Sequence, residues 1–285
     1  MKKNLVKKTV LPVFVALLCS VIALTGVSYA WFSMGNTATV KGMDMEVTAA
    51  DGLQISASGD ATSFKSTLIL TQSKTNAKAV STDGTYNSGL KFYTGQIVEG
   101  QLGQVAEAAG TDYIMFDIYV KVSSATKLQL DKESVVAAVA NAKNSTLQTN
   151  LAARVAFVDL GSATTPDGAK ALAPAAGTVK IWEPNSTTRS TAAANAGAQA
   201  GKLDYKGIVS TAGAESRNNV ATFDFIGENE DKSVELFELE AGYNKVRVYI
   251  WLEGQDIDCV NEVSGGKFSI TLNLSKPQAQ NQQNQ

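Results

Sequence analysis

Two stretches near the end of the chain decide its fold: KVRVYIWL at residues 245–252 and KFSITLNL at residues 267–274. In each of them apolar and polar side chains alternate with a period of two, which is the pattern of a β-strand with one face on a core. The predicted inward faces are Val246, Val248, Ile250 and Leu252 in the first stretch and Phe268, Ile270, Leu272 and Leu274 in the second. The two stretches therefore predict a β protein with a hydrophobic core.

The same alternation recurs upstream. Strong strands are predicted in residues 113–122 (YIMFDIYVKV) and 152–160 (AARVAFVDL), and shorter ones at 179–182, 220–226 and 233–239. Residues 58–112 are predicted to be mostly loop, with weak strands at 67–71 and 91–94. An Ala-rich segment with Val135, Val136 and Val139 at helical spacing predicts one short helix, with Asp131 as its N-cap.

About ten short strands, one short helix and no repeating βα unit predict an all-β fold, an antiparallel jelly-roll-like sandwich. We expect a single β-sandwich domain over residues 31–276. Its N-terminal strand is predicted at residues 31–49, and residues 186–219, rich in Ala, Thr, Gly and Asn, are predicted to be a low-complexity surface excursion. Residues 277–285 have nothing to bury and are expected to be a disordered tail.

The first 30 residues have the layout of a signal peptide, expected to be a helix. Four lysines precede the mostly apolar run from Val10 to Val27, and Ser28 and Ala30 supply the small residues that signal peptidase requires at a cleavage site. We expect signal peptidase to cut after Ala30, which predicts a secreted, extracellular or cell-surface protein. The alternative is a retained anchor, because the 18 residues of the apolar run would form a helix of ~27 Å, just enough to cross a hydrocarbon core. The membrane is expected to be a partner only through this segment.

Charge and residue usage exclude several functions. Four of the 25 basic residues lie in the signal, so the rest of the chain carries 21 basic against 27 acidic residues, a net charge of −6. This balance argues against nucleic-acid binding, which needs clustered Lys and Arg. The chain contains no histidine, which removes the commonest general base, the commonest zinc ligand and every Ser-His or Cys-His nucleophile. We therefore expect no catalytic residue and no enzyme activity.

Carboxylates gather in the sequence after Trp251. Glu253, Asp256 and Asp258 are spaced so that their oxygens could reach a hard cation such as calcium. The alternative is a solvated turn whose carboxylates cap local backbone N–H groups. No other cofactor is expected.

Three further side chains have both a functional and a structural interpretation. Trp182 and Trp251 could form a platform for a carbohydrate, but both lie in alternating strands, where a buried aromatic side chain is the commoner outcome. Cys259 is the only cysteine after residue 30, which rules out an intrachain disulfide there. Burial as a small apolar side chain is favoured over an intermolecular bond or a reactive thiol.

Three passages carry a family resemblance: SYAWFS at the signal junction, IWEPN at residues 181–185 and VYIWLEGQDIDCVN at residues 248–261. With these passages the chain resembles the TasA and camelysin family of exported biofilm-fibre proteins of Gram-positive bacteria. The resemblance implies a jelly-roll subunit in the extracellular space or at the cell surface that polymerises by donating its N-terminal strand to a neighbour. Camelysin has been classed as a metallopeptidase, but this chain has no HExxH motif.

The segment from Trp31 carries the sharpest functional prediction. Its candidate polymerisation residues are Trp31, Phe32, Val40, Met43, Met45 and Val47. The strand either closes the sandwich of its own domain or pairs with the next subunit by strand addition. A strand that is freed only by cleavage would couple export to assembly and avoid premature polymerisation inside the cell.

The sequence thus predicts an exported structural subunit of an extracellular or cell-surface fibre. Its partners are expected to be copies of itself, joined by exchange of the N-terminal donor strand. The alternative is a monomeric or membrane-tethered surface module for adhesion or binding.

Overall fold

The computed structural model describes residues 43–50, 52–72, 78–98, 101–139, 149–184, 224–226, 233–254, 259 and 267–277. Several predicted features lie outside these ranges. They are the signal segment with Ser28 and Ala30, the strand residues Trp31, Phe32 and Val40, the carboxylates Asp256 and Asp258, the excursion at 186–219 and the tail after Pro277. Among the described residues there is no helix of the length and apolar character needed to cross a bilayer.

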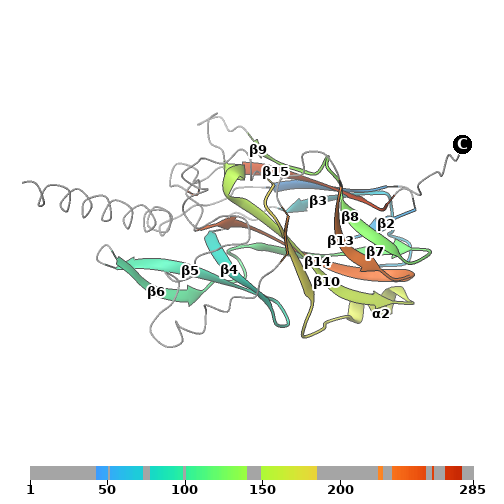
Figure 1. Cartoon of the computed structure of the whole chain (residues 1–285), viewed down its shortest axis with the longest axis horizontal. Helices are drawn as coiled ribbons and strands as arrows, with labels where there is room; N and C mark the ends of the chain where they lie inside the picture. The colour runs from blue at the N-terminus through green and yellow to red at the C-terminus, as the bar shows by residue number, and fades with distance from the viewer. Residues whose placement is uncertain are drawn as a thin grey trace, which may run out of the picture.

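The described chain folds into two β-sheets that lie one above the other (Figure 1). The six-stranded sheet consists of β1 (Met43–Ala49), β3 (Thr67–Gln72), β8 (Thr126–Leu130), β9 (Val135–Val139), β13 (Val234–Leu239) and β15 (Lys267–Ser275). The nine-stranded sheet consists of β2 (Gln54–Ser56), β4 (Ala79–Tyr86), β5 (Leu90–Val98), β6 (Gln101–Glu107), β7 (Ile114–Val122), β10 (Ala153–Ala163), β11 (Thr178–Trp182), β12 (Asp224–Ile226) and β14 (Gly242–Glu253). The prediction of an all-β fold is confirmed.

Most strand pairs of the described chain are antiparallel, but three are parallel. The six-stranded sheet has the order β13-β8-β15-β1-β3, with β9 beside β8 along the same edge of β15. The parallel pairs are β1 with β15, β11 with β12, and β14 with β4. Parallel neighbours need a long connection between them, and β1 and β15 meet this condition by lying at opposite ends of the described chain.

The main hydrophobic core fills the space between the two sheets. The two stretches that predict the fold lie in opposite sheets, β14 in one and β15 in the other, and their predicted inward side chains all belong to this core. Trp182 and Cys259 are buried in the same core, so each is a buried side chain, as the structural interpretation predicted. Period-two alternation on both sides of a sandwich produces this arrangement.

A second core covers the outer face of the nine-stranded sheet. Tyr249 and Trp251, which alternate with the inward side chains of β14, are buried under the hairpin of β4 and β5. Phe92 of that hairpin lies 5.2 Å from Trp251 between ring centroids and meets it edge to face. Trp251 is therefore part of a packed core and offers no open platform for a sugar.

Residues 58–112 are not mostly loop, so this part of the prediction is wrong, whereas the weak strands predicted at 67–71 and 91–94 lie within observed strands. Residues 58–112 contain β3, β4, β5 and β6. Two of these strands form the hairpin that covers the second core. In β4 the run at residues 81–85 (STDGT) separates the apolar residues, and in β5 Thr94, Gly95 and Gln96 separate them, so neither strand alternates regularly. Strands of this composition give little periodic signal.

The helix expected after Asp131 is also wrong, because residues 135–139 form β9 and pair with β15. The Asp131 carboxylate accepts a hydrogen bond from the Glu133 N–H at 3.0 Å, which closes a turn before a strand rather than capping a helix. A 3₁₀ turn, η1, spans Thr149–Ala152. The single short helix in the described chain is α2 (Pro166–Ala171), whose N-cap is Thr165.

A partly buried charge cluster fixes α2 and β7 to β14. Lys245 is 6% exposed, and its ammonium donates to the carbonyls of Lys170 at 3.1 Å and Leu172 at 2.8 Å at the end of α2. It also lies 3.3 Å from Asp117 on β7, and Arg247 donates two hydrogen bonds to the same carboxylate at 2.7 and 3.0 Å. Burial alone would raise the pKa of Asp117, but the bonds and charges of Arg247 and Lys245 outweigh it and hold that pKa below its usual value.

We expect Asp117→Asn to lower the free energy of unfolding by about 2 kcal/mol at pH 7, because two partly buried cations lose their carboxylate. A carboxyl whose pKa is depressed by folding stabilises the fold above its unfolded pKa and loses that effect as pH falls. The difference between variant and wild type should therefore shrink below about pH 4. Urea unfolding at several pH values measures it.

Asp167→Asn is the matched control for this prediction. Asp167 also pairs with a lysine, Lys170, but its side chain is 91% exposed, so its loss should change stability little. Equal effects of the two variants would contradict the role given to Asp117.

Candidate assembly site

The described part of the predicted N-terminal strand, residues 43–49, lies inside the six-stranded sheet, next to the edge strand β3. β1 pairs in parallel with β15, from Met43 opposite Phe268 to Ala49 opposite Leu274. On its other side it pairs antiparallel with β3, from Met43 opposite Gln72 to Thr48 opposite Thr67. We call the space between β15 and β3 that β1 occupies the β1 slot. In the described chain β3 joins this sheet only through β1.

Alternating side chains fix which face of β1 meets the core. Met45 and Val47 are 1% and 0% exposed, whereas Glu46 between them is exposed. Met45 lies in register with Ile270 and Leu70, and Val47 lies in register with Leu272 and Leu68. A shift of one residue would place Glu46 in the core, so the apolar pattern specifies the register strongly.

A polar contact on the outer side of the slot supports the same register. The Thr48 hydroxyl donates to Asn273 Oδ1, its direct partner on β15. Along the edge of β15, β8 pairs with Leu274 and Ser275 and β9 pairs with residues 267–271, so Asn273 lies between these two neighbours. There the Asn273 N–H donates to Ser134 Oγ at 2.9 Å. The Asp131 N–H donates to the Asn273 carbonyl at 2.7 Å. Asn273 is thus held in place by groups outside β1.

The chain leaves the slot through a tight turn after β1. The Ala50 N–H donates to the Leu274 carbonyl at 2.9 Å, and the Leu53 N–H donates to the Ala50 carbonyl at 3.0 Å. Gly52 has a φ of +83°, in the left-handed region that favours glycine. A Cβ at this position would come within 2.3 Å of the Lys276 ammonium. The Lys276 ammonium is the end of a flexible side chain and can move away, so the positive φ is what favours glycine on the path from β1 to β2.

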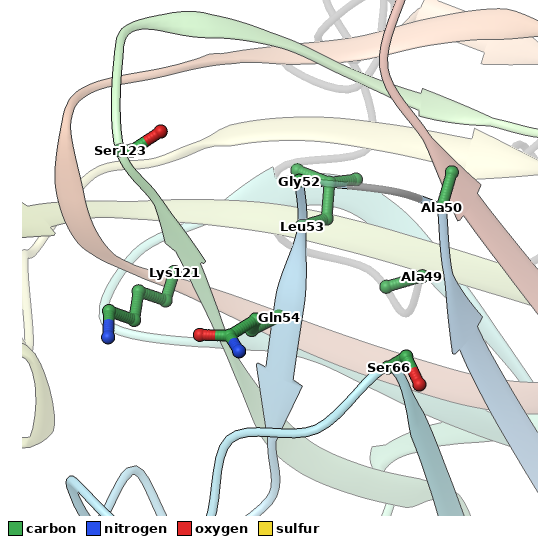
Figure 2. Close-up of a pocket in the computed structure, with 8 residues that line it drawn as sticks. All are labelled: Ala49, Ala50, Gly52, Leu53, Gln54, Ser66, Lys121 and Ser123. Atoms are coloured by element: carbon green, nitrogen blue, oxygen red, sulfur yellow. The ribbon is translucent and has the colours of Figure 1, made fainter.

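A cavity of about 530 Å³ opens beside this turn. Figure 2 shows that its walls come from the turn itself, from Lys121 and Ser123 at the end of β7, and from Ser66 before β3. The turn therefore has free space next to it. Leu53 forms part of the wall and is nevertheless 2% exposed, because its side chain belongs to the core.

The structure brings together part of the predicted polymerisation set. Met43, Met45 and Val47 all lie in β1, and the last two fill the slot. Sequence reasoning missed the other half of the site, the pairing of β1 with β15 and β3 and the Thr48–Asn273 contact. The alternation in KFSITLNL marked β15 as a strand, but nothing in it identified β1 as its neighbour.

The predicted calcium ligands are only partly within the described chain. Glu253 is fully buried and accepts a hydrogen bond from Trp251 Nε1 at 3.1 Å. Opposite Trp251 in register lies Arg154, which forms a buried ion pair with Glu183 at 2.8 Å. No group of three or more acidic, Cys or His side chains suited to a metal occurs among the residues that the structure describes. Calcium binding stays a prediction.

Comparisons of the chain with protein-family models, with curated proteins and with solved structures found no match.

Truncation inside the slot should destabilise the fold. We expect Met45→Ala in the full chain to lower the free energy of unfolding by about 3 kcal/mol, because a buried side chain is replaced by a void. Protection from hydrogen exchange should fall in β3 as well as in β1, since β3 is held through β1. Urea unfolding and hydrogen-exchange mass spectrometry measure the two effects.

Glu46→Ala changes the neighbouring, exposed side chain of the same strand and serves as the control, with little change expected. If Met45→Ala were as stable as the wild type, the slot would not hold the sheet together.

Proposed function

We propose that this protein is a non-catalytic, exported structural subunit of an extracellular or cell-surface fibre. In this proposal β1 of one subunit enters the β1 slot of the next. The observation that carries it is the position of β1: a strand near the N-terminus lies between two other strands of a sheet and continues into the rest of the domain through the turn that follows Ala50. The resemblance to TasA-type fibre proteins supports the same function.

Exchange of β1 between subunits would reuse the contacts of the closed monomer. The same backbone ladders with β15 and β3, the same buried Met45 and Val47 and the same Thr48–Asn273 bond would form between two chains. Exchange of an identical element costs little because nearly all interactions are conserved. Only the turn after β1 must change its path, and the cavity beside Gly52 leaves room for that change.

A head-to-tail exchange of this kind does not close on itself unless the rotation between subunits happens to form a ring. Each subunit donates one strand and receives one, so copies add in a line. Cleavage after Ala30 would free the donor segment for this step.

The second candidate is a monomeric or membrane-tethered surface module. The observation that favours it is that β1 also completes the sheet of its own chain, so a closed monomer has a filled slot. Electron microscopy of secreted material separates the two functions. A subunit repeat along fibres supports exchange, whereas dispersed single particles support the module.

The exchange can be tested with two chains, one beginning at Trp31 and one at Asp51. We expect the longer chain to form filaments and the shorter one to form none, because the shorter chain has a slot but no strand to donate. A synthetic peptide of residues 31–50 added to the shorter chain should fill the slot and give a stable one-to-one complex without filaments. Negative-stain microscopy and sedimentation velocity provide the measurements.

Two peptide variants control for non-specific binding. A peptide with Val47→Asp should fail to stabilise the shorter chain, since it would bury a charge with no counter-charge. A peptide with Glu46→Gln should bind as the natural one does, because this position is exposed. Filaments from the chain that begins at Asp51, in the absence of peptide, would contradict the proposal.

A further inference from the structure

In the part of the chain that the structure describes, β3 forms one edge of the six-stranded sheet. β2 bonds only to Lys65 just before this strand, and the edge from Thr67 onward lacks the features that usually protect an edge strand. Thr67–Gln72 (TLILTQ) contains no charge, no proline and no glycine. At its centre Ile69 is 72% exposed, the largest value among the exposed large apolar side chains of the described chain. Natural edge strands commonly carry Lys, Pro, an inward charge or a bulge against pairing with another chain.

The other outer strands of this sheet are protected. β13, at the opposite edge, carries Glu235 and Glu238 and has a register shift between Glu235 and Phe237. β9 is uncharged, but the Asn150 side chain from η1 donates to its Val136 carbonyl at 3.3 Å. β3 therefore differs from both of them.

The hydrogen-bonding pattern shows which backbone groups of β3 point away from β1. The Ala49 N–H donates to the Ser66 carbonyl at 2.7 Å, so Ser66 faces β1. Lys65 exchanges both backbone bonds with Ile55 of β2, at 2.7 and 2.9 Å, so it faces the other way. Because these directions alternate along an antiparallel strand, the N–H and C=O groups of Thr67, Ile69 and Thr71 point toward the open edge.

The side chains of β3 suit a second copy of the same strand. If two β3 strands pair antiparallel about a two-fold axis at Ile69, each Ile69 faces its equivalent, Thr67 faces Thr71, and Leu68 faces Leu70. Every pair then joins positions on the same face of the sheet, and each consists of like residues: Ile with Ile, Thr with Thr and Leu with Leu. Apolar and Thr–Thr pairs of this kind stabilise antiparallel neighbours.

We propose that two copies of this chain associate through their β3 edges, with Ile69 at the two-fold axis. The six-stranded sheets of the two copies then continue into one another. Leu68 and Leu70, which are half-buried in the single chain, become covered by the partner copy's strand. A two-fold contact uses the same surface on both copies and closes at two.

This association does not rest on strand exchange, because it requires only that β1 be in its slot, from whichever chain. In a monomeric module it would produce a dimer. In a fibre it would join two fibres side by side.

The test uses the full chain as wild type, Ile69→Lys and Ile69→Glu, each alone and with the two variants mixed, in sedimentation velocity over a range of concentrations. The wild type should form dimers or larger even-numbered species. Each variant alone should associate at least about tenfold more weakly, because like charges would face each other at the axis. Mixing the two variants should restore association, since opposite charges then meet.

Val135→Lys is the matched control, because Val135 is also exposed, at 47%, on β9 of the same sheet. Val135→Lys should associate as the wild type does. Any association through the apolar run at residues 10–27 would be the same in all variants and would not produce a difference between them. The proposal is overturned if the wild type does not self-associate, if Ile69→Lys associates as well as Val135→Lys, or if the mixture of charge variants associates no better than either variant alone.

Discussion

The insertion of β1 between β15 and β3 is the interaction on which the six-stranded sheet depends. One strand makes a parallel ladder on one side and an antiparallel ladder on the other, and it adds Met45 and Val47 to the core. Without it β3 would lose the neighbour that links it to this sheet, and β15 would lose its hydrogen-bonded partner along one edge. A small segment near the N-terminus thus completes a core made mostly by the C-terminal half of the chain.

The nine-stranded sheet is built in a different way, because its central strands are buried on both faces. β14 is paired with β7 and β10, packs its even-numbered apolar side chains into the main core, and packs Tyr249 and Trp251 under the β4–β5 hairpin. Lys245 and Arg247 on the same strand fix α2 and Asp117. In the proposals above this sheet keeps its pairing, and only the six-stranded sheet exchanges a strand or pairs at its edge.

The strongly alternating strands could be predicted from the sequence, because successive side chains of a strand point to opposite faces and the apolar residues alternate with the same period of two. The hairpin of β4 and β5 was predicted only as a weak strand at 91–94, since Ser, Thr, Asp and Gly residues interrupt the alternation in both of its strands. The helix predicted after Asp131 failed for another reason: Val135, Val136 and Val139 fit a helical spacing, but β15 offers them a ladder. In the candidate site, Met45 and Val47 were predictable as a strand face, whereas Thr48 and Asn273 meet only through the fold.

The most direct test of the central claim asks whether β1 of one chain reaches β15 of another. Thr48 and Asn273 are direct partners in the ladder, so cysteines placed there should be near enough for a disulfide. Chains beginning at Trp31 would carry either Thr48→Cys or Asn273→Cys, both with Cys259→Ala, and would be mixed before assembly and oxidised afterwards. The account predicts a disulfide that joins the two kinds of chain within the fibres. Cross-linking that occurs only within a single chain carrying both cysteines, and never between chains in the mixture, would contradict it.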